Sequence, residues 1–188
     1  EMKRYYTRGC NFYYGKESKQ LIFEKKTIPL NDNKETRNTW GNYKFELLYE
    51  IELTPKTLRT RFIINNKGTE AFDFQALLHT YYKLPSIQDI AITGLQNKKY
   101  LDKLKDGEEF SENSVNIHFT EEVDRIYKNA PPSVNLKIDK ENEIRIQMST
   151  SNNSDDHDVV LWNPHIAKSK RMGDFGDDEW KNMVCVEP

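Results

Sequence analysis

Apolar and polar residues alternate along much of this chain, a pattern typical of β-strands with one buried face. The longest such run is Tyr43–Leu53, in which every second residue is aromatic or aliphatic and the residues between them are mostly charged. A second alternating run, Leu58–Ile64, follows a turn that contains Pro55. Both runs are predicted to form half-buried antiparallel strands.

The run Phe72–Leu84 is the most informative of the predicted strands. One face is apolar, and the opposite face aligns Asp73, Gln75, His79 and Tyr81. Because residues two apart lie on the same side of a strand, these polar groups should share one surface. Polar side chains aligned with a histidine indicate either a solvent-facing surface or a binding cleft.

Shorter runs predict further strands, and helices are nearly absent from the pattern. These strands are expected over Gln20–Ile28, Ile87–Thr93, Val115–Phe119, Arg125–Tyr127, Val134–Asp139, Glu143–Ser149 and Val159–Trp162. Two of them, Val134–Asp139 and Glu143–Ser149, should form a hairpin. One helical turn is expected over Asp177–Asn182, with Asp177 as its N-cap. The chain is therefore predicted to be all-β, a sandwich in a single domain over 1–188.

Composition narrows the function classes. The chain has 188 residues, and its 28 Lys and Arg nearly balance 30 Asp and Glu, which argues against a nucleic-acid-binding surface. No apolar run approaches the about 18 residues of a membrane helix. Cys10 and Cys185 lie near opposite ends without CxxC spacing, so we expect a reducing compartment, the cytoplasm. No metal-binding or cofactor motif is present, and we expect neither group.

Three residues could carry acid–base chemistry, and each has a plainer interpretation. His79 could be a structural histidine beside the core, although its polar strand face favours a site. Glu187 follows the buried strand predicted at Met183–Val186, yet the pattern alone favours an exposed chain end. Asp124 and Arg125 should point to opposite faces of a strand and could simply be charges on an exposed edge.

Four segments in order together resemble a known family. They are Phe72–Tyr82 (FDFQALLHTYY), Gly94-Leu95 with Tyr100–Lys103 (YLDK), Glu122–Tyr127 (EVDRIY) and the stretch from Val160 to Glu187 that contains DFGDD and MVCVE. This order resembles the galactose-mutarotase-like enzymes, and the last segment is similar to their glucose-6-phosphate 1-epimerase branch. The resemblance covers the chain from about residue 43 to its end.

The resemblance implies a β-supersandwich enzyme that interconverts the α and β anomers of a hexose phosphate. In that family, the histidine matching His79 is the general acid at the ring oxygen, and the glutamate matching Glu187 is the general base. The aspartate matching Asp124 binds sugar hydroxyls, and Arg8 matches an arginine that helps to hold the phosphate. Gln75 and Tyr81, on the strand face of His79, are further candidate contacts to the sugar.

Elementary chemistry agrees with these roles, because ring opening needs one proton removed from the C1 hydroxyl and another delivered to the ring oxygen. An imidazole and a carboxylate on opposite sides of the sugar are expected to suffice. Compared with the family pattern, the N-terminal portion and the last strand of the full domain are expected to be absent. The expected partner is a small hexose phosphate, with no nucleic acid or membrane, and a monomer is expected. Two alternatives stay open: a non-catalytic sugar-phosphate-binding module, and an aldose 1-epimerase for unphosphorylated hexoses.

Overall fold

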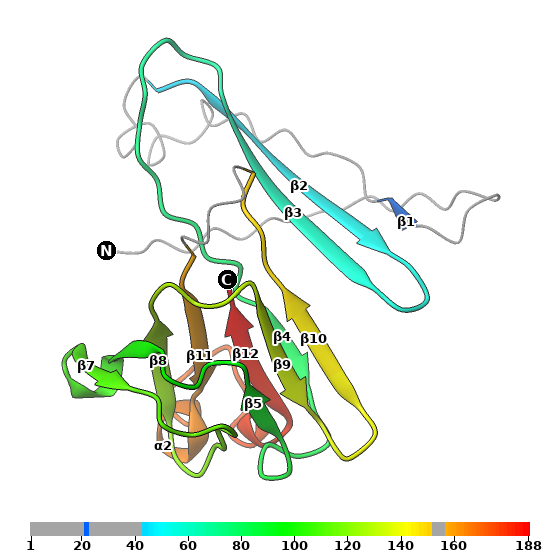
Figure 1. Ribbon diagram of the computed structural model, residues 1–188, viewed down its shortest axis with the longest axis vertical. Coiled ribbons are helices and arrows are strands. Elements are labelled where there is room, and N and C mark those ends of the chain that lie inside the picture. The colour runs from blue at the N-terminus through cyan, green and yellow to red at the C-terminus, as the bar shows by residue number, and fades with distance from the viewer. Residues whose placement is uncertain (1–20, 23–42, 152–156) are drawn as a thin grey trace. The chain divides into compact units, whose positions relative to one another are not determined.

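A computed structural model describes residues 21–22, 43–151 and 157–188 of the chain (Figure 1). The chain divides into two compact units, Glu1–Gln75 and Ala76–Pro188. The single domain predicted over 1–188 stays a prediction. In the described part of the chain, no helix is long and apolar enough to span a membrane.

The first unit contains an antiparallel sheet in the order β1-β2-β3. Its strands are β1 (Leu21–Ile22), β2 (Phe45–Leu53) and β3 (Leu58–Asn66). The two predicted strands in this region are therefore confirmed, and they form a long hairpin. Of the strand predicted over Gln20–Ile28, only Leu21–Ile22 is described, and the rest lies outside the described residues.

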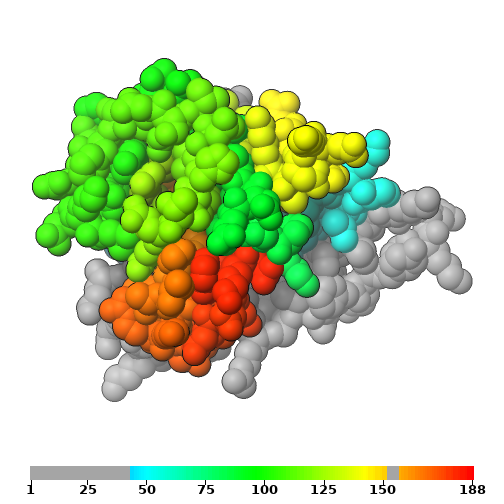
Figure 2. Space-filling model, turned by 90° about the horizontal axis from the view of Figure 1, so that it is seen from below, coloured from blue at the N-terminus to red at the C-terminus, as the bar shows by residue number. Residues whose placement is uncertain are grey.

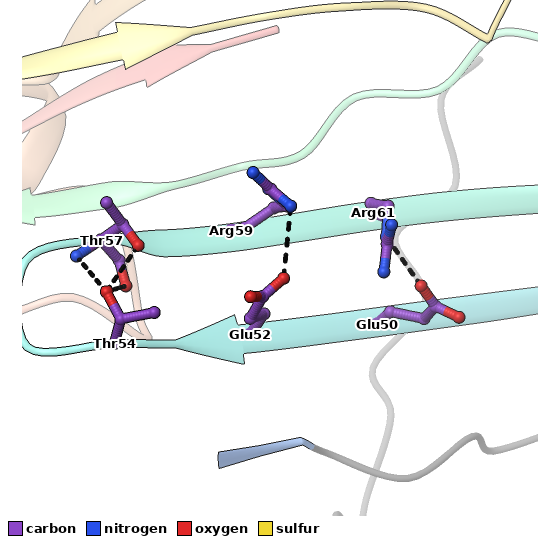
Figure 3. A network of polar contacts seen from close by, with 6 residues as sticks. All are labelled: Glu50, Glu52, Thr54, Thr57, Arg59 and Arg61. Atoms are coloured by element: carbon purple, nitrogen blue, oxygen red, sulfur yellow. Dashed lines mark hydrogen bonds and ion pairs between the residues drawn. The ribbon is translucent and has the colours of Figure 1, made fainter. Parts of the chain in front are cut away.

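The hairpin is closed by a compact turn and carries ion pairs between opposite residues (Figure 3). In the turn, the Thr57 backbone N–H donates to Thr54 Oγ1 at 2.9 Å. Arg61 Nε lies 2.7 Å from Glu50 Oε2, and Arg59 Nη1 lies 3.3 Å from Glu52 Oε2. These pairs are direct neighbours in the register of β2 and β3, so the alternating charges of the sequence meet across the hairpin.

The second unit contains two sheets. The larger has six antiparallel strands in the order β4-β12-β11-β8-β6-β7. These are β4 (Tyr81–Lys83), β12 (Met183–Glu187), β11 (Val159–Asn163), β8 (Val123–Tyr127), β6 (Lys99–Asp102) and β7 (Glu108–Ser111). The smaller sheet has the order β10-β9-β5, with β10 (Glu143–Gln147), β9 (Ser133–Lys137) and β5 (Ala91–Thr93). The pairing of β9 with β10 confirms the predicted hairpin.

The two sheets share one hydrophobic core, which makes the second unit a sandwich. Alternate residues of the larger sheet, such as Leu161 and Val186, belong to the same buried cluster as Val134 and Leu136 of the smaller sheet. The opposite face of the larger sheet carries a separate small cluster, formed by Trp162, Met183 and Cys185. The all-β prediction is confirmed, and the larger sheet has a second face that points away from the main core.

Several predicted elements are wrong in extent. The strand predicted over Phe72–Leu84 is a strand only at Tyr81–Lys83, because β12 offers pairing partners to these three residues alone. Val115–Phe119 is not a strand and makes only an isolated bridge between Ile117 and Ile92. Strands β6 and β7 were not predicted, because they are short and rich in charges, so their alternation is weak.

The helical elements of the described residues are short. The structure contains α2 (His165–Ser169), which was not predicted, and the 3₁₀ turns η2 (Lys103–Lys105) and η3 (Glu179–Asn182). The predicted helical turn is therefore present as η3, but its N-cap is Asp178 and not Asp177, and no side-chain cap is formed. Figure 2 shows the C-terminal segment, in orange and red, gathered at one side of the second unit.

Candidate active site

Strand β12 presents two different faces. Val184 and Val186 are fully buried in the main core, whereas Met183, Cys185 and Glu187 point to the opposite face of the larger sheet. Glu187 is only 1% exposed. The plainer interpretation of Glu187 as an exposed chain end is therefore wrong, because pairing of β12 with β11 and β4 places this residue inside the sheet.

His79 meets Glu187 because the chain continues the alignment of β4 with β12. Tyr81 pairs with Cys185 in the antiparallel register. His79, two residues before Tyr81, therefore lies opposite Glu187, two residues after Cys185. The Leu78 backbone N–H donates to the Pro188 carbonyl at 3.4 Å and holds this extension in place. His79 Nδ1 lies 2.9 Å from Glu187 Oε1, and the histidine side chain is 37% exposed. A surface-accessible imidazole thus contacts a buried carboxylate.

This contact leaves the carboxylate incompletely satisfied. Its 2.9 Å separation fits an ion pair, but the groups are not aligned for a hydrogen bond, and Glu187 Oε1 has no hydrogen-bond partner among the described residues. Buried polar atoms are nearly always hydrogen-bonded in folded proteins, so a buried carboxylate oxygen with an ion pair but no hydrogen bond is unusual. Because Nδ1 faces Glu187, Nε2 on the far edge of the imidazole is the nitrogen positioned to reach a ligand.

Cys185 lies beside the same two residues. Its Sγ is 3.6 Å from His79 Nδ1, and the side chain is buried. Burial raises the pKa of the Cys185 thiol, and the charge of Glu187 and the contact with it act in the same direction. Cys185 is therefore a neutral thiol near neutral pH and no nucleophile by itself.

Aromatic rings fix the plane of the imidazole. Tyr81 stacks on His79 with ring centroids 4.8 Å apart, and Trp162 meets the same imidazole edge-on at 5.5 Å. Phe175 closes the group at 6.5 Å from Tyr81 and 6.4 Å from Trp162. The alignment of His79 with Tyr81 on one face, predicted from the period of two, is confirmed even though His79 lies before the strand begins.

Asp124 lies on the same face, in an interior strand. It pairs in register with Trp162 on β11, and β8 has β6 on its other side, so the exposed-edge interpretation is wrong. Partial burial raises the pKa of Asp124; Lys103 and Lys168 oppose this rise, while the charges of Glu122 and Glu187 add to it. The charge of Glu187 therefore reaches Asp124 across this face, and two lysines are close enough to affect the same Asp124 carboxyl group.

Arg125 points to the other face, as predicted. Its Nη1 lies 3.4 Å from Glu112 Oε2, and its guanidinium covers the Tyr100 ring at 4.7 Å. Arg125 thus belongs to the packing of the larger sheet and not to the group around His79.

Two of the other predicted site residues stay predictions. Gln75 is exposed and ends the first unit. Arg8 lies outside the described residues. Sequence reasoning did not predict that Cys185 lies in the candidate site. Its position two residues before Glu187 already placed both on the same face of the strand.

Comparison with known proteins identifies the family. The family model described as aldose 1-epimerase matches residues 24–188. A protein of Cenchrus ciliaris named "Putative glucose-6-phosphate 1-epimerase" is 36% identical over 149 residues, covering 78% of this chain and 44% of that protein. A protein of the same name from Escherichia coli is 30% identical over 161 residues, covering 86% of this chain and 51% of that protein.

A solved structure agrees with these relatives. The crystal structure of a protein described as a "putative mutarotase" from Salmonella typhimurium matches with a TM-score of 0.70 and 26% identity. The match covers 89% of this chain and 52% of that one. The chain thus spans about half the length of the curated relatives it matches. The predicted mutarotase-like fold and the resemblance read from the sequence are confirmed, and the chain belongs to the aldose 1-epimerase family.

Proposed function

We propose that this chain forms a glucose-6-phosphate 1-epimerase site in which His79 is the general acid and Glu187 the general base. The observation that carries the proposal is the 2.9 Å contact between an accessible imidazole and a carboxylate that is almost fully buried. Family membership and the names of two relatives support the reaction and the phosphorylated substrate.

The reaction needs only two proton transfers. Glu187 accepts the proton of the C1 hydroxyl while protonated His79 donates one to the ring oxygen, so the C1–O5 bond breaks and an aldehyde forms. Rotation about C1–C2 turns the other face of the aldehyde to the C5 hydroxyl. On reclosure, His79 takes the proton of that hydroxyl and Glu187 returns its proton to the carbonyl oxygen. Both residues end in their starting states.

The contact between acid and base suits this reaction better than the arrangement expected from the sequence. We expected the two groups on opposite sides of the sugar, but Nδ1 and Oε1 are in contact. The two reacting oxygens are bonded to the same carbon, C1, so a close pair can reach both. With Nδ1 held at Glu187, Nε2 would serve the ring oxygen, and the Tyr81 and Trp162 rings would hold the imidazole in that orientation.

The remaining residues of this face would bind the sugar. Asp124, half-buried on the neighbouring strand β8, would accept hydrogen bonds from hydroxyls, and the exposed Tyr81 ring would pack on an apolar face of the pyranose. Lys103 and Lys168, whose charges reach Asp124, supply positive potential for an anionic substrate. Arg8 and Gln75 are further proposed contacts.

The test is the equilibration of freshly dissolved α-glucose 6-phosphate, followed by polarimetry or by coupling to a dehydrogenase specific for the β anomer. Glu187→Gln and His79→Gln should each lower the rate about a hundredfold or more, because each removes one proton-transfer group. Matched controls are Glu109→Gln and His118→Gln, an exposed acid paired with Lys99 and a histidine bonded to the Ile90 carbonyl. The controls should keep the wild-type rate.

Three outcomes would decide against the proposal. Full activity in both Glu187→Gln and His79→Gln would show that the pair is not the acid–base machinery. Saturable binding of glucose 6-phosphate without acceleration above the spontaneous rate would favour the non-catalytic binding module. Equal rates on glucose and glucose 6-phosphate would instead favour an aldose 1-epimerase that does not select the phosphate.

A further inference from the structure

Three different metal-binding atoms converge at the site. His79, Cys185 and Glu187 each offer one donor atom, and these atoms all lie within 4.8 Å of one another. His79 Nδ1 is 2.9 Å from Glu187 Oε1 and 3.6 Å from Cys185 Sγ. The cluster arises because Cys185 and Glu187 share one face of β12 and the chain at His79 extends the neighbouring strand.

Both spacings from His79 Nδ1 are close to those of a tetrahedral metal centre. Zinc bonds of about 2.0–2.1 Å to nitrogen or oxygen and about 2.3 Å to sulfur, at tetrahedral angles, place nitrogen and oxygen about 3.3 Å apart and nitrogen and sulfur about 3.6 Å apart. The nitrogen–sulfur spacing already matches, and the nitrogen–oxygen spacing needs to widen by a few tenths of an ångström. A small shift of the imidazole within its own plane, which keeps the stacking on Tyr81, would provide that movement.

The donor set and the Glu187 oxygen without a hydrogen bond both point to a cation of the zinc class. Metal binding would displace the Cys185 proton, and the resulting thiolate, imidazole and carboxylate together favour Zn²⁺ or a similar cation over Mg²⁺ or Ca²⁺, which prefer oxygen ligands. Glu187 Oε1 is buried, faces this cluster and has no hydrogen-bond partner among the described residues. A bound cation would give this oxygen a ligand bond in place of the hydrogen bond that it lacks.

We propose that His79, Cys185 and Glu187 bind Zn²⁺ as three protein ligands and leave a fourth position open. This claim concerns metal binding and stands on the geometry alone. A consequence follows that rests on the proposed function: bound Zn²⁺ occupies the Glu187 carboxylate, which is the proposed base, so Zn²⁺ is a reversible inhibitor of the epimerase that competes with the sugar.

The binding test uses Co²⁺ as a spectroscopic probe of the full chain. A thiolate-to-cobalt charge-transfer band in the near ultraviolet reports sulfur ligation directly and does not depend on activity. We expect this band in the wild type and its loss on addition of excess Zn²⁺. Zn²⁺ affinity, measured by competition with a chromogenic chelator, should fall at least tenfold in Cys185→Ser, and Mg²⁺ should not compete.

Matched variants separate this site from other cysteine chemistry. The chain contains one other cysteine, Cys10, and Cys10→Ser should keep both the cobalt band and the Zn²⁺ affinity. His79→Gln should lower the affinity at least tenfold, whereas His118→Gln should not. A band that survives in Cys185→Ser but disappears in Cys10→Ser would overturn the proposal, as would the absence of any band in a folded wild-type protein.

The inhibition test separates the two proposals. Zn²⁺ that binds and raises the apparent KM for glucose 6-phosphate, with relief by EDTA, supports both. Zn²⁺ binding in a protein without epimerase activity would leave the metal site standing and contradict the proposed function. Wild-type epimerase activity that is indifferent to Zn²⁺, together with no cobalt band, would contradict the metal site alone.

Discussion

The two faces of the six-stranded sheet in the second unit carry different kinds of side chain, although the same strands form both. One face packs Val184, Val186 and Leu161 into the main core with essentially no exposure. The other face presents Cys185, Glu187 and their neighbours from adjacent strands. Because side chains alternate along a strand, one short segment both anchors the sheet and supplies residues of the candidate site. Residues next to one another in sequence should therefore respond to substitution in different ways.

Two buried glutamates sharpen this comparison. Glu112 accepts hydrogen bonds from Tyr127 Oη at 2.9 Å and from the Ser114 backbone N–H at 2.9 Å, and it pairs with Arg125. Glu187 contacts His79 and Cys185 but keeps one oxygen without a hydrogen-bond partner among the described residues. A buried carboxylate that accepts several hydrogen bonds stabilises the fold. A buried carboxylate with an oxygen that accepts none is a candidate for acid–base chemistry.

The largest effect on stability should come from the core face. Leu161→Ala should lower the free energy of unfolding by about 2–5 kcal/mol, because it removes a fully buried side chain and leaves a cavity between the sheets. Glu187→Gln, on the opposite face, should lower it by no more than about 1 kcal/mol while abolishing most activity. Urea unfolding followed by fluorescence of Trp162 and Trp180 measures both. Equal losses of stability in Leu161→Ala and Glu187→Gln would show that the two faces of the sheet contribute equally to stability.

A smaller effect should come from the hydrogen-bonded glutamate. Tyr127→Phe should lower the free energy of unfolding by about 1–3 kcal/mol, because it removes a hydroxyl donor to the charged Glu112 and leaves the ring packing intact. Anomerisation should stay at the wild-type rate, since Tyr127 faces the main core. The same urea titration and the polarimetric assay measure these effects, and a hundredfold loss of rate would place Tyr127 in the site.

Substitution of Asp124 should raise the stability of the folded protein, unlike the substitutions of Leu161 and Tyr127. Burial raises its pKa in the folded state, so the folded protein binds this proton more readily than the unfolded chain, and the ionised carboxylate weakens folding at neutral pH. Asp124→Asn should therefore raise stability at pH 7 by less than about 1 kcal/mol, given the partial exposure of the group. The gain should vanish as the pH falls from the raised pKa to below the ordinary value of 3.8. A gain that grows towards acid pH would contradict this sign.

The smallest effect should come from the exposed ion pairs of the β2–β3 hairpin in the first unit. The Arg61 and Glu50 side chains are 56% and 41% exposed, so solvent screens their attraction. Arg61→Ala should change stability by no more than about 0.5 kcal/mol, and raising the salt concentration should erase even that difference. If Arg61→Ala lowered stability as much as Tyr127→Phe does, the exposure of a polar contact would not determine how much it contributes to stability.

Much of this arrangement could be predicted from the sequence. The strands β2, β3, β9, β10 and β11 follow runs with a strong local pattern, and β12 follows an apolar run. The alignment of His79 with Tyr81 also follows from the period of two, and the family resemblance drew attention to Glu187 and Asp124. Local pattern failed at residues 72–80 and at β6 and β7, where a strand exists only if a neighbour pairs with it.

The sequence by itself determined the strand character of the chain, the membership of the family and the residues that face one way along each strand. It left open whether Glu187 is exposed, whether Asp124 sits on an edge, and whether Cys185 lies beside His79. Tertiary structure decided these points, because burial and contact depend on which strands become neighbours. His79 and Glu187 are separated by more than a hundred residues, and only the pairing of the chain around β4 with β12 brings them within 2.9 Å.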